Sequence, residues 1–281
     1  MTAPVTLEEL KKKVGEPWLR WEGAIEGERV QQYVKATGDS NPRWQGPNAE
    51  VPPAFLATLG GGDALAVIMG LKAVILLGTS DLECFRPVRI DDTVTATTSM
   101  VSLRERESQA GSTAFITLRT DIANRRCDRV ASNTQLILVR SGGLVTKRHG
   151  FDDTCGEQEI LPLVKQTTMA QMAAWAEASG DNNPIHCDSE YAVSRGLPGV
   201  IVPGQLVLAF LGQMITDWLG TKGHLARLSI RYKGMNYPGK VITCRGVVTA
   251  RGGEDIVLKV WAENSQEEQT VAGTATAHIL S

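Results

Sequence analysis

The chain has 281 residues, of which 42% are hydrophobic and 21% charged, and its formal net charge is −2 at pH 7. These fractions are typical of a globular protein with a full core, and the length suits two domains of ordinary size. A net charge near zero gives no electrostatic argument for binding nucleic acid or an anionic membrane. The five cysteines show no C-x-x-C spacing, so neither a disulfide framework nor a zinc site is expected.

The N-terminal segment predicts a short amphipathic helix that Thr6 caps and that ends near Gly15. It lacks the charged-then-apolar layout of a signal peptide. The longest apolar stretches, such as AVILLG at 73–78, are too short to span a bilayer. We therefore expect a cytoplasmic protein that has neither a membrane nor nucleic acid as a partner.

Two similar motifs indicate an internal repeat. TGDSNPRW (37–44) and SGDNNPIH (179–186) share Gly, Asp, Asn and Pro in register, at an offset of 142 residues. VPPAFL (51–56) follows the first motif and VPGQLV (202–207) follows the second, and each opens an apolar run. Because the order of features agrees, we interpret the chain as two copies of one fold, joined within residues 141–162.

The second copy predicts helices followed by strands. Capping residues delimit three helices, between Thr167 or Thr168 and Gly180, between Asp188 and Gly196, and between Pro203 and Gly220. β-rich segments follow at 228–234, 240–251, 255–264 and 270–280. This order indicates an α+β fold in which a curved antiparallel sheet wraps a buried helix. The first copy follows the same plan, although Gly60, Gly61 and Gly62 interrupt its central helix and residues 73–78 add strand.

The second motif has the residue types of an acid-base site. Asp181 and His186 are five residues apart, and Asn183 precedes a proline, so the chain turns between them. The turn can aim a carboxylate and an imidazole at one small volume, where they could activate a water molecule. Asn183 could orient either partner or hold the loop. The alternative is structural: Asp181 caps the turn and His186 is an ordinary buried histidine.

The helix that begins at Pro203 and Gly204 adds a second element to this site. The first N–H groups of a helix have no partner within it, and they lie at its positive end. Such groups can stabilise a carbonyl oxygen on which negative charge develops. Gly204 is therefore a candidate oxyanion donor.

These segments, SGDNNPIHCDSEYA and then GLPGVIVPGQ, resemble the hydratase motif of the MaoC-like, (R)-specific enoyl-CoA hydratases, also called hydratase 2. The first half resembles the dehydratase-like N-terminal domain of two-copy members. The resemblance implies a double hot-dog fold, made of two tandem units that each wrap a sheet around a central helix. Residues 1–145 would be a degenerate hot-dog domain, for substrate binding or structure, and residues 155–281 the catalytic MaoC-like domain.

The resemblance also implies the reversible addition of water across the 2,3 double bond of an enoyl thioester, which gives a 3-hydroxyacyl thioester. The family's catalytic Asp and His correspond to Asp181 and His186, and its oxyanion glycine corresponds to Gly204. No cofactor is implied, because coenzyme A or acyl carrier protein is part of the substrate. Homo-oligomers of double hot-dog chains remain open. The family usually has His-Gly where this chain has Pro203 and Gly204, and proline cannot donate a backbone hydrogen bond.

The first motif lacks the catalytic pair. Trp44 stands where His186 stands in the second copy, and an indole N–H cannot accept a proton. Arg43 could neutralise Asp39. Two interpretations stay open: this half binds substrate and is widened for a bulkier acyl group, or it is a scaffold. Trp44 is accordingly either a substrate contact or a packing residue.

Several points remain alternatives at the sequence level. Four basic residues near the strand starts could meet the phosphates of coenzyme A or could be solvated surface charge: Arg86, Arg89, Arg231 and Lys233. Other hot-dog proteins hydrolyse thioesters, and a non-catalytic acyl-CoA binding subunit is a third reading. The acyl group itself cannot be read from these motifs, so the metabolic setting is fatty acid or organic acid metabolism in general.

Overall fold

The computed structural model describes residues 5–71, 73–108, 111–141, 156 and 158–280. The first half contains α1 Leu7–Lys11, β1 Pro17–Ala24, α2 Gly27–Thr37, η1 Pro42–Trp44, η2 Pro53–Thr58, α3 Gly61–Met69, β2 Val74–Cys84, β3 Thr93–Ser108, β4 Gly111–Asn124 and β5 Arg129–Ser141. The second half contains β6 Gln158–Glu159, β7 Leu163–Gln166, α4 Met169–Ser179, η3 Pro184–His186, α5 Ser189–Ser194, α6 Gly204–Leu219, β8 Gly223–Tyr232, β9 Val241–Gly252, β10 Asp255–Glu263 and β11 Gln269–Ile279.

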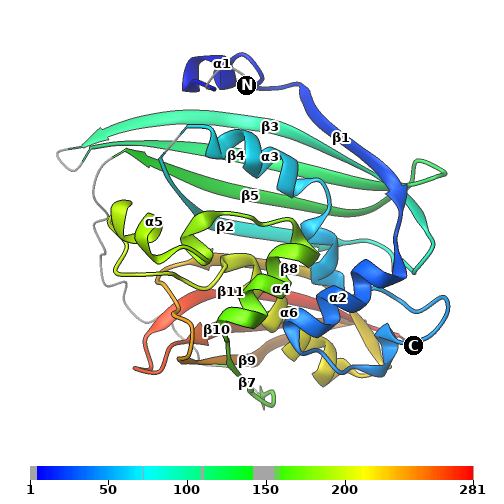
Figure 1. The fold of residues 1–281 in the computed structure, drawn as a ribbon. Helices are drawn as coiled ribbons and strands as arrows, with labels where there is room; N and C mark the ends of the chain where they lie inside the picture. Colours follow the sequence, from blue (N-terminus) through cyan, green and yellow to red (C-terminus); the bar gives the residue numbers. More distant parts are fainter. Residues whose placement is uncertain (1–4, 72, 109–110, 142–155, 157, 281) are drawn as a thin grey trace.

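The strands of the described residues form one sheet in the order β1-β3-β4-β5-β2-β8-β11-β10-β9-β6, with β7 also paired to β9. Each half contributes a block of long strands, and helices α2, α4 and α6 lie together against the sheet (Figure 1). No helix in the described part of the chain is long and apolar enough to cross a membrane.

The two halves repeat the same local geometry. Helices α2 and α4 start and end 142 residues apart, and so do the short helices η1 and η3. The turn after β4 is built on Asn124, whose side-chain oxygen accepts from the N–H groups two and four residues later. Asn264 builds the turn after β10 in the same way. The internal repeat predicted from the sequence is therefore present in the structure.

Strands β2 and β8 join the halves into one sheet. They pair antiparallel from Thr79 opposite Arg231 to Glu83 opposite Arg227, so the first residues of β2 extend beyond the end of β8. Helices α2 and α4 also pack across this seam, where the rings of Tyr33 and Trp175 lie 5.4 Å apart. An edge of β2 is thus left open at the seam.

The central helices differ between the halves. Helix α6 has apolar residues on most of its surface and is buried along nearly its whole length. In the first half, η2 and the nine-residue α3 replace it, and Gly60 between them has a left-handed backbone (φ 70°). Thr98 Oγ1 donates to the carbonyl of Gly60 at 3.3 Å, and Asn133 Nδ2 donates to that of Ala57 at 3.4 Å. Polar side chains of the sheet therefore satisfy carbonyls that the interruption frees.

Several helix ends predicted from the sequence are confirmed, but α1 ends at Lys11, before the predicted end near Gly15. Thr6 forms a capping box with Glu9 at the start of α1. Thr168 caps α4, which ends at Gly180 in the left-handed conformation (φ 76°). Pro203 lies one residue before α6 rather than inside its first turn. The join between the halves lies mostly outside the described residues.

Candidate active site

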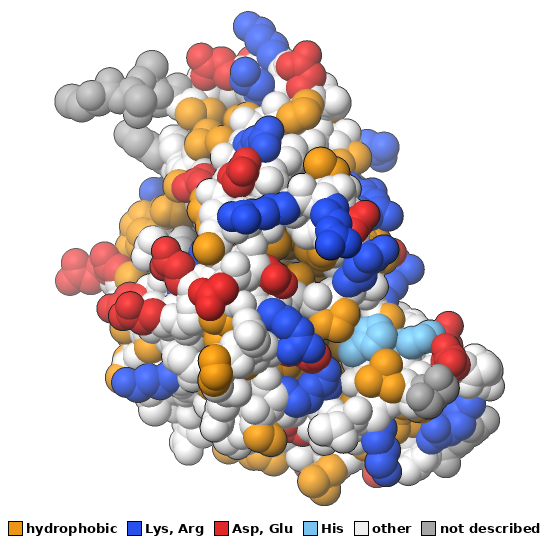
Figure 2. All heavy atoms as spheres, turned by 90° about the vertical axis from the view of Figure 1, so that its right-hand side faces the viewer, with side chains coloured by type: hydrophobic (Ala, Val, Ile, Leu, Met, Phe, Trp, Pro, Cys, Tyr) orange, Lys and Arg blue, Asp and Glu red, His pale blue; other side chains and the backbone are white. Residues whose placement is uncertain are grey.

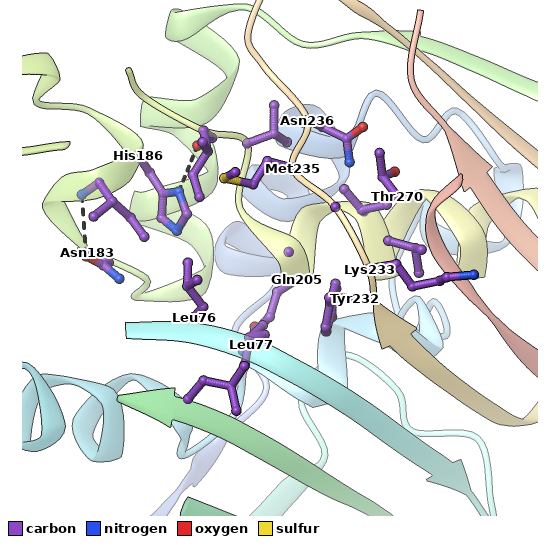
Figure 3. Close-up of a pocket in the computed structure, with 18 of the residues that line it drawn as sticks. Leu76, Leu77, Asn183, His186, Gln205, Tyr232, Lys233, Met235, Asn236 and Thr270 are labelled. Carbon is purple, nitrogen blue, oxygen red and sulfur yellow. Dashed lines mark hydrogen bonds between the residues drawn. The ribbon is translucent and has the colours of Figure 1, made fainter. Parts of the chain in front are cut away.

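The sequence-predicted residues Asp181, His186 and Gly204 line one cavity of about 710 Å³. The cavity lies at the seam between the halves, where Leu76 and Leu77 on the open edge of β2 face the η3 loop and the start of α6 (Figure 3). Both halves of the chain therefore contribute to its walls.

A series of hydrogen bonds shapes the loop that carries the acid-base pair. Asp181 Oδ1 accepts from the N–H of Asn183 at 3.4 Å, and Asn183 Oδ1 accepts from the N–H of Ile185 at 3.4 Å. Asn183 Nδ2 donates to the carbonyl of Ile75 on β2, also at 3.4 Å. Of the two roles considered for Asn183, holding the loop is the one its contacts show, and these contacts also fasten the loop to the first half.

The contacts of His186 determine which nitrogen is free to react. Nδ1 lies 2.8 Å from the carbonyl oxygen of Ile201, which can only accept, so Nδ1 carries the hydrogen. In the neutral ring Nε2 is then the unprotonated nitrogen. Nε2 lies 3.8 Å from Asp181 Oδ2, beyond hydrogen-bonding distance, and both side chains are almost buried. The pair is close enough for one small molecule to contact both groups.

Gly204 is the first residue of α6, and nothing larger fits there without movement. A Cβ at this position would lie 3.0 Å from Tyr232 Cε1 and 3.3 Å from Leu77 Cδ1. Pro203, immediately before it, accepts from the N–H groups of Leu206 and Val207 and so forms a regular helix start. A proline in place of the histidine expected from the resemblance therefore preserves the helix start, although it supplies no imidazole.

Tyr232 lines the cavity beside Gly204. Its hydroxyl lies 3.1 Å from Ser80 Oγ. Burial and, less strongly, the charge of Asp181 raise the pKa of Tyr232 well above its ordinary value, despite the opposing hydrogen bond from Ser80. The tyrosine is therefore a neutral hydroxyl at physiological pH.

The first half supplies an apolar wall that the sequence did not identify. Seven hydrophobic side chains from this half line the cavity: Leu65, Ile75, Leu76, Leu77, Leu118, Ile137 and Leu138. Gln135 and Arg140 of β5 line it as well. These residues come from α3, β2, β4 and β5, so the wall depends on the pairing of distant strands.

Only one of the four predicted basic residues lies at this cavity. Lys233 lines it, and its Nζ donates to Gln269 Oε1 at 3.3 Å. Arg86 pairs with Asp128 and Arg89 pairs with Glu50, away from the cavity. Arg231 is exposed on β8 and is not among the lining residues.

The first motif forms a closed structure instead of a cavity. Trp44 is 1% exposed, and its Nε1 donates to Asp39 Oδ2 at 3.0 Å. Trp44 does not line the large cavity but a second one of about 30 Å³. Burial raises the pKa of Asp39. In the first copy the indole of Trp44 thus lies beside the carboxylate of Asp39, where the second copy has His186 beside Asp181.

The suggestion that Arg43 neutralises Asp39 is wrong. Arg43 forms an ion pair with Glu50 at 2.6 Å and donates to the carbonyls of Gly220 and Gly223. The cation near Asp39 is Lys165, which lowers the carboxyl pKa less than burial raises it. Arg43 is engaged by the carbonyl that ends α6, the carbonyl of the first residue of β8 and the carboxylate of Glu50.

Sequence reasoning also missed Ser80, Gln135 and Asn236. Gln135 and Asn236 are buried, line the cavity and each have a side-chain polar atom without a hydrogen-bond partner in the described structure. A polar residue at a core-facing position of a strand is the signal that could have identified Ser80 and Gln135. Asn236 lies in a loop, where no pattern distinguishes it.

Comparison with known proteins agrees with this two-part organisation. Residues 12–133 match the FAS1-like dehydratase domain region, and residues 153–271 match the MaoC-like domain. The peroxisomal enoyl-CoA hydratase 2 of Arabidopsis thaliana is 23% identical over 232 residues, which cover 76% of this chain and 70% of that protein. An enoyl-CoA hydratase of Mycobacterium tuberculosis, ChsH3, is 27% identical over 135 residues, which cover 47% of this chain and 46% of that protein.

A solved structure supports the fold. A Mycobacterium tuberculosis protein described as a double hotdog fold has a TM-score of 0.72 and 11% identity, covering 94% of this chain and 97% of that one. At this identity the similarity concerns the fold alone, and it confirms the predicted α+β double hot-dog. The chain therefore carries a FAS1-like dehydratase domain region in its first half and a MaoC-like domain in its second.

Proposed function

We propose that this protein is a hydro-lyase that adds water to, or removes it from, the 2,3 double bond of an enoyl thioester. One observation carries the proposal: His186 Nε2, Asp181 Oδ2 and the first residue of α6 face one cavity, with the two side chains 3.8 Å apart. The MaoC-like domain match and the names of the two hydratase relatives support the same chemistry.

In the hydration direction, a water molecule contacts both Asp181 and His186. His186 Nε2 accepts a proton from this water, because Nδ1–H is held by Ile201. The water oxygen forms a bond to C3 while the electrons of the double bond move toward the thioester oxygen. The N–H of Gly204 stabilises the resulting negative charge. Protonated His186 then returns this proton to C2 on the same face, which completes the 3-hydroxyacyl thioester and restores the neutral imidazole, and dehydration is the reverse.

The first half is proposed to bind the acyl group. Its own motif is closed by Trp44, whereas α3, β2, β4 and β5 supply an apolar wall to the cavity of the other half. This division supports the reading of residues 1–145 as a substrate-binding domain and residues 155–281 as the catalytic one. Trp44 is then a packing residue in the first half.

The thioester carrier is proposed to be coenzyme A or acyl carrier protein, with no separate cofactor. Lys233 and Arg140 are the cationic side chains at the cavity that could face carrier phosphates. On the face in Figure 2, basic and acidic side chains are interspersed, which offers little to a nucleic acid backbone. We propose a cytoplasmic location, and oligomerisation through the double hot-dog remains open to measurement.

The decisive experiment compares equivalent aspartates in the two copies. Asp181→Asn should lower the hydration rate of crotonyl-CoA by roughly 10²-fold or more, as should His186→Gln, because Asp181 is the carboxylate that contacts the water and His186 takes its proton. Asp39→Asn is the matched control, since Asp39 has the same place in the first motif. Loss of the enoyl absorbance measures the rate.

The result also separates the competing functions. Near wild-type rates in folded Asp181→Asn and His186→Gln would refute the assignment, and an equal loss in Asp39→Asn would mean that the first motif is catalytic. Release of free thiol without change at the double bond would indicate a thioesterase. Binding without either reaction would indicate an acyl-CoA binding subunit.

A further inference from the structure

Gln135 is a buried polar side chain in the wall that the proposed function assigns to the acyl group. It lies on β5, is 7% exposed and lines the same cavity as Asp181 and His186. Its Nε2 has no hydrogen-bond partner within the described structure. A buried amide without a partner is unfavourable, so a native core rarely retains one without a reason.

The side chains around Gln135 make this position selective. Its register partners are Leu118 on β4 and Ser80 on β2. Ser80 in turn is hydrogen-bonded to Tyr232, whose ring lies against the position of Gly204. Gln135, Ser80 and Tyr232, which we call the polar row, thus run from the oxyanion position into the first half. Leucine or isoleucine would pack this wall better if only hydrocarbon bound there.

We propose that the polar row recognises an oxygen substituent on the acyl chain, and that the preferred substrates are enoyl thioesters carrying a keto or hydroxyl group beyond the double bond. This inference rests on the proposed hydratase function. The amide of Gln135 supplies both a donor and an acceptor, which suits either substituent.

The charges near Gln135 favour a neutral substituent over a carboxylate. Its register partners, Leu118 and Ser80, carry no charge, and burying a carboxylate without a cation is strongly unfavourable. Arg140 also lines the cavity, but side chains alternate along β5, so its side chain leaves the strand on the opposite face from that of Gln135. A charged acyl terminus would therefore lack a counter-ion at the polar row.

The test uses matched pairs of 2-enoyl-CoA thioesters. The two members of a pair have the same chain length, and only one of them carries a keto or hydroxyl group. The position of this group moves from C5 outward from one pair to the next. For at least one position, wild-type kcat/KM should be about tenfold higher for the oxygenated member, because the plain chain leaves the amide without a partner. Calorimetric binding of the saturated thioester pairs supplies a readout that does not need turnover.

Gln135→Met keeps the side-chain volume and removes the amide, so it should abolish the preference while the plain chain is still hydrated. Gln213→Met is the matched control, because Gln213 on α6 is similarly buried but does not line the cavity. This variant should keep the wild-type preference for the oxygenated substrate. The inference is overturned if the wild type shows no preference for the oxygenated member at any position, and this result does not depend on the folding of a variant. It is also overturned if Gln135→Met retains the wild-type preference. A preference in binding without hydration would refute the hydratase function and leave this inference standing.

Discussion

Replacing Gly204 by alanine tests whether the start of α6 acts in catalysis. The added Cβ would lie 3.0 Å from Tyr232 Cε1 and 3.3 Å from Leu77 Cδ1, so one of these groups or the helix start must move by a few tenths of an ångström. The tyrosine is partly buried against the core and its hydroxyl is bonded to Ser80, which restricts its movement. The N–H of residue 204 should therefore shift relative to the bound thioester.

The expected loss follows from the value of one oxyanion donor. Complete loss of such a donor costs about 3 kcal/mol of transition-state stabilisation, or roughly 10²-fold in kcat. A displaced donor loses part of this, so Gly204→Ala should lower kcat by about 10-fold to 100-fold. Stability should not fall in parallel, because alanine favours a helix by up to about 1 kcal/mol over glycine. Crotonyl-CoA hydration and thermal unfolding measure the two effects separately.

Gly212→Ala is the control within the same helix. Its Cβ would lie 3.3 Å from the Cβ of Ala54, a comparably tight contact, but residue 212 does not line the cavity. This variant should retain kcat. If folded Gly204→Ala also retains kcat, or if both variants lose it equally, the role assigned to the start of α6 is incorrect.

Two further predictions concern the acyl wall and a surface histidine. Leu65→Trp on α3 should lower kcat/KM for long-chain enoyl thioesters by about tenfold or more through steric exclusion while leaving crotonyl-CoA almost unchanged, and an equal loss for both substrates would contradict an acyl role for this wall. The hydrogen bond to Asp255, with Glu254 nearby, raises the pKa of His278. The stabilisation from this pair is then complete below the ordinary pKa of 6.5 and is lost as pH rises through the raised pKa. The difference in free energy of unfolding between wild type and His278→Gln should therefore shrink from about pH 6 to about pH 9, and a constant difference would contradict this assignment.

The sequence predicted the second half well because its signals are local. Thr168 and Gly180 delimit α4 through contacts within a few residues, and the same holds for Asp188 at the start of α5. The turn of Asp181 and Asn183 is likewise fixed by neighbours in the chain. Local capping and turn chemistry can be read from residue types without knowledge of the fold.

The contents of the cavity could not be predicted in the same way. Ser80 and Tyr232 are 152 residues apart, and they meet because β2 pairs with β8 across the seam. No local pattern specifies that pairing, so Leu77 and Gln135 were not recognised as neighbours of the motif. Arg43 was misassigned for the same reason, because its true partners include carbonyls of residues 220 and 223 in the other half.

The interrupted helix of the first half leaves room for the large cavity at the seam. In the second half the sixteen residues of α6 fill the space inside the sheet. In the first half Gly60 lies against the sheet, where a Cβ would come within 3.3 Å of Ala96 Cβ and Thr98 Oγ1, and the helix restarts only at Gly61. The shorter α3 presents Gly61 and Leu65 to the cavity, whereas a continuous helix like α6 would place side chains in that space. The shorter α3 and the indole of Trp44 beside Asp39 both distinguish the first half from the second, and the space that the shorter helix leaves adjoins the site of Asp181 and His186.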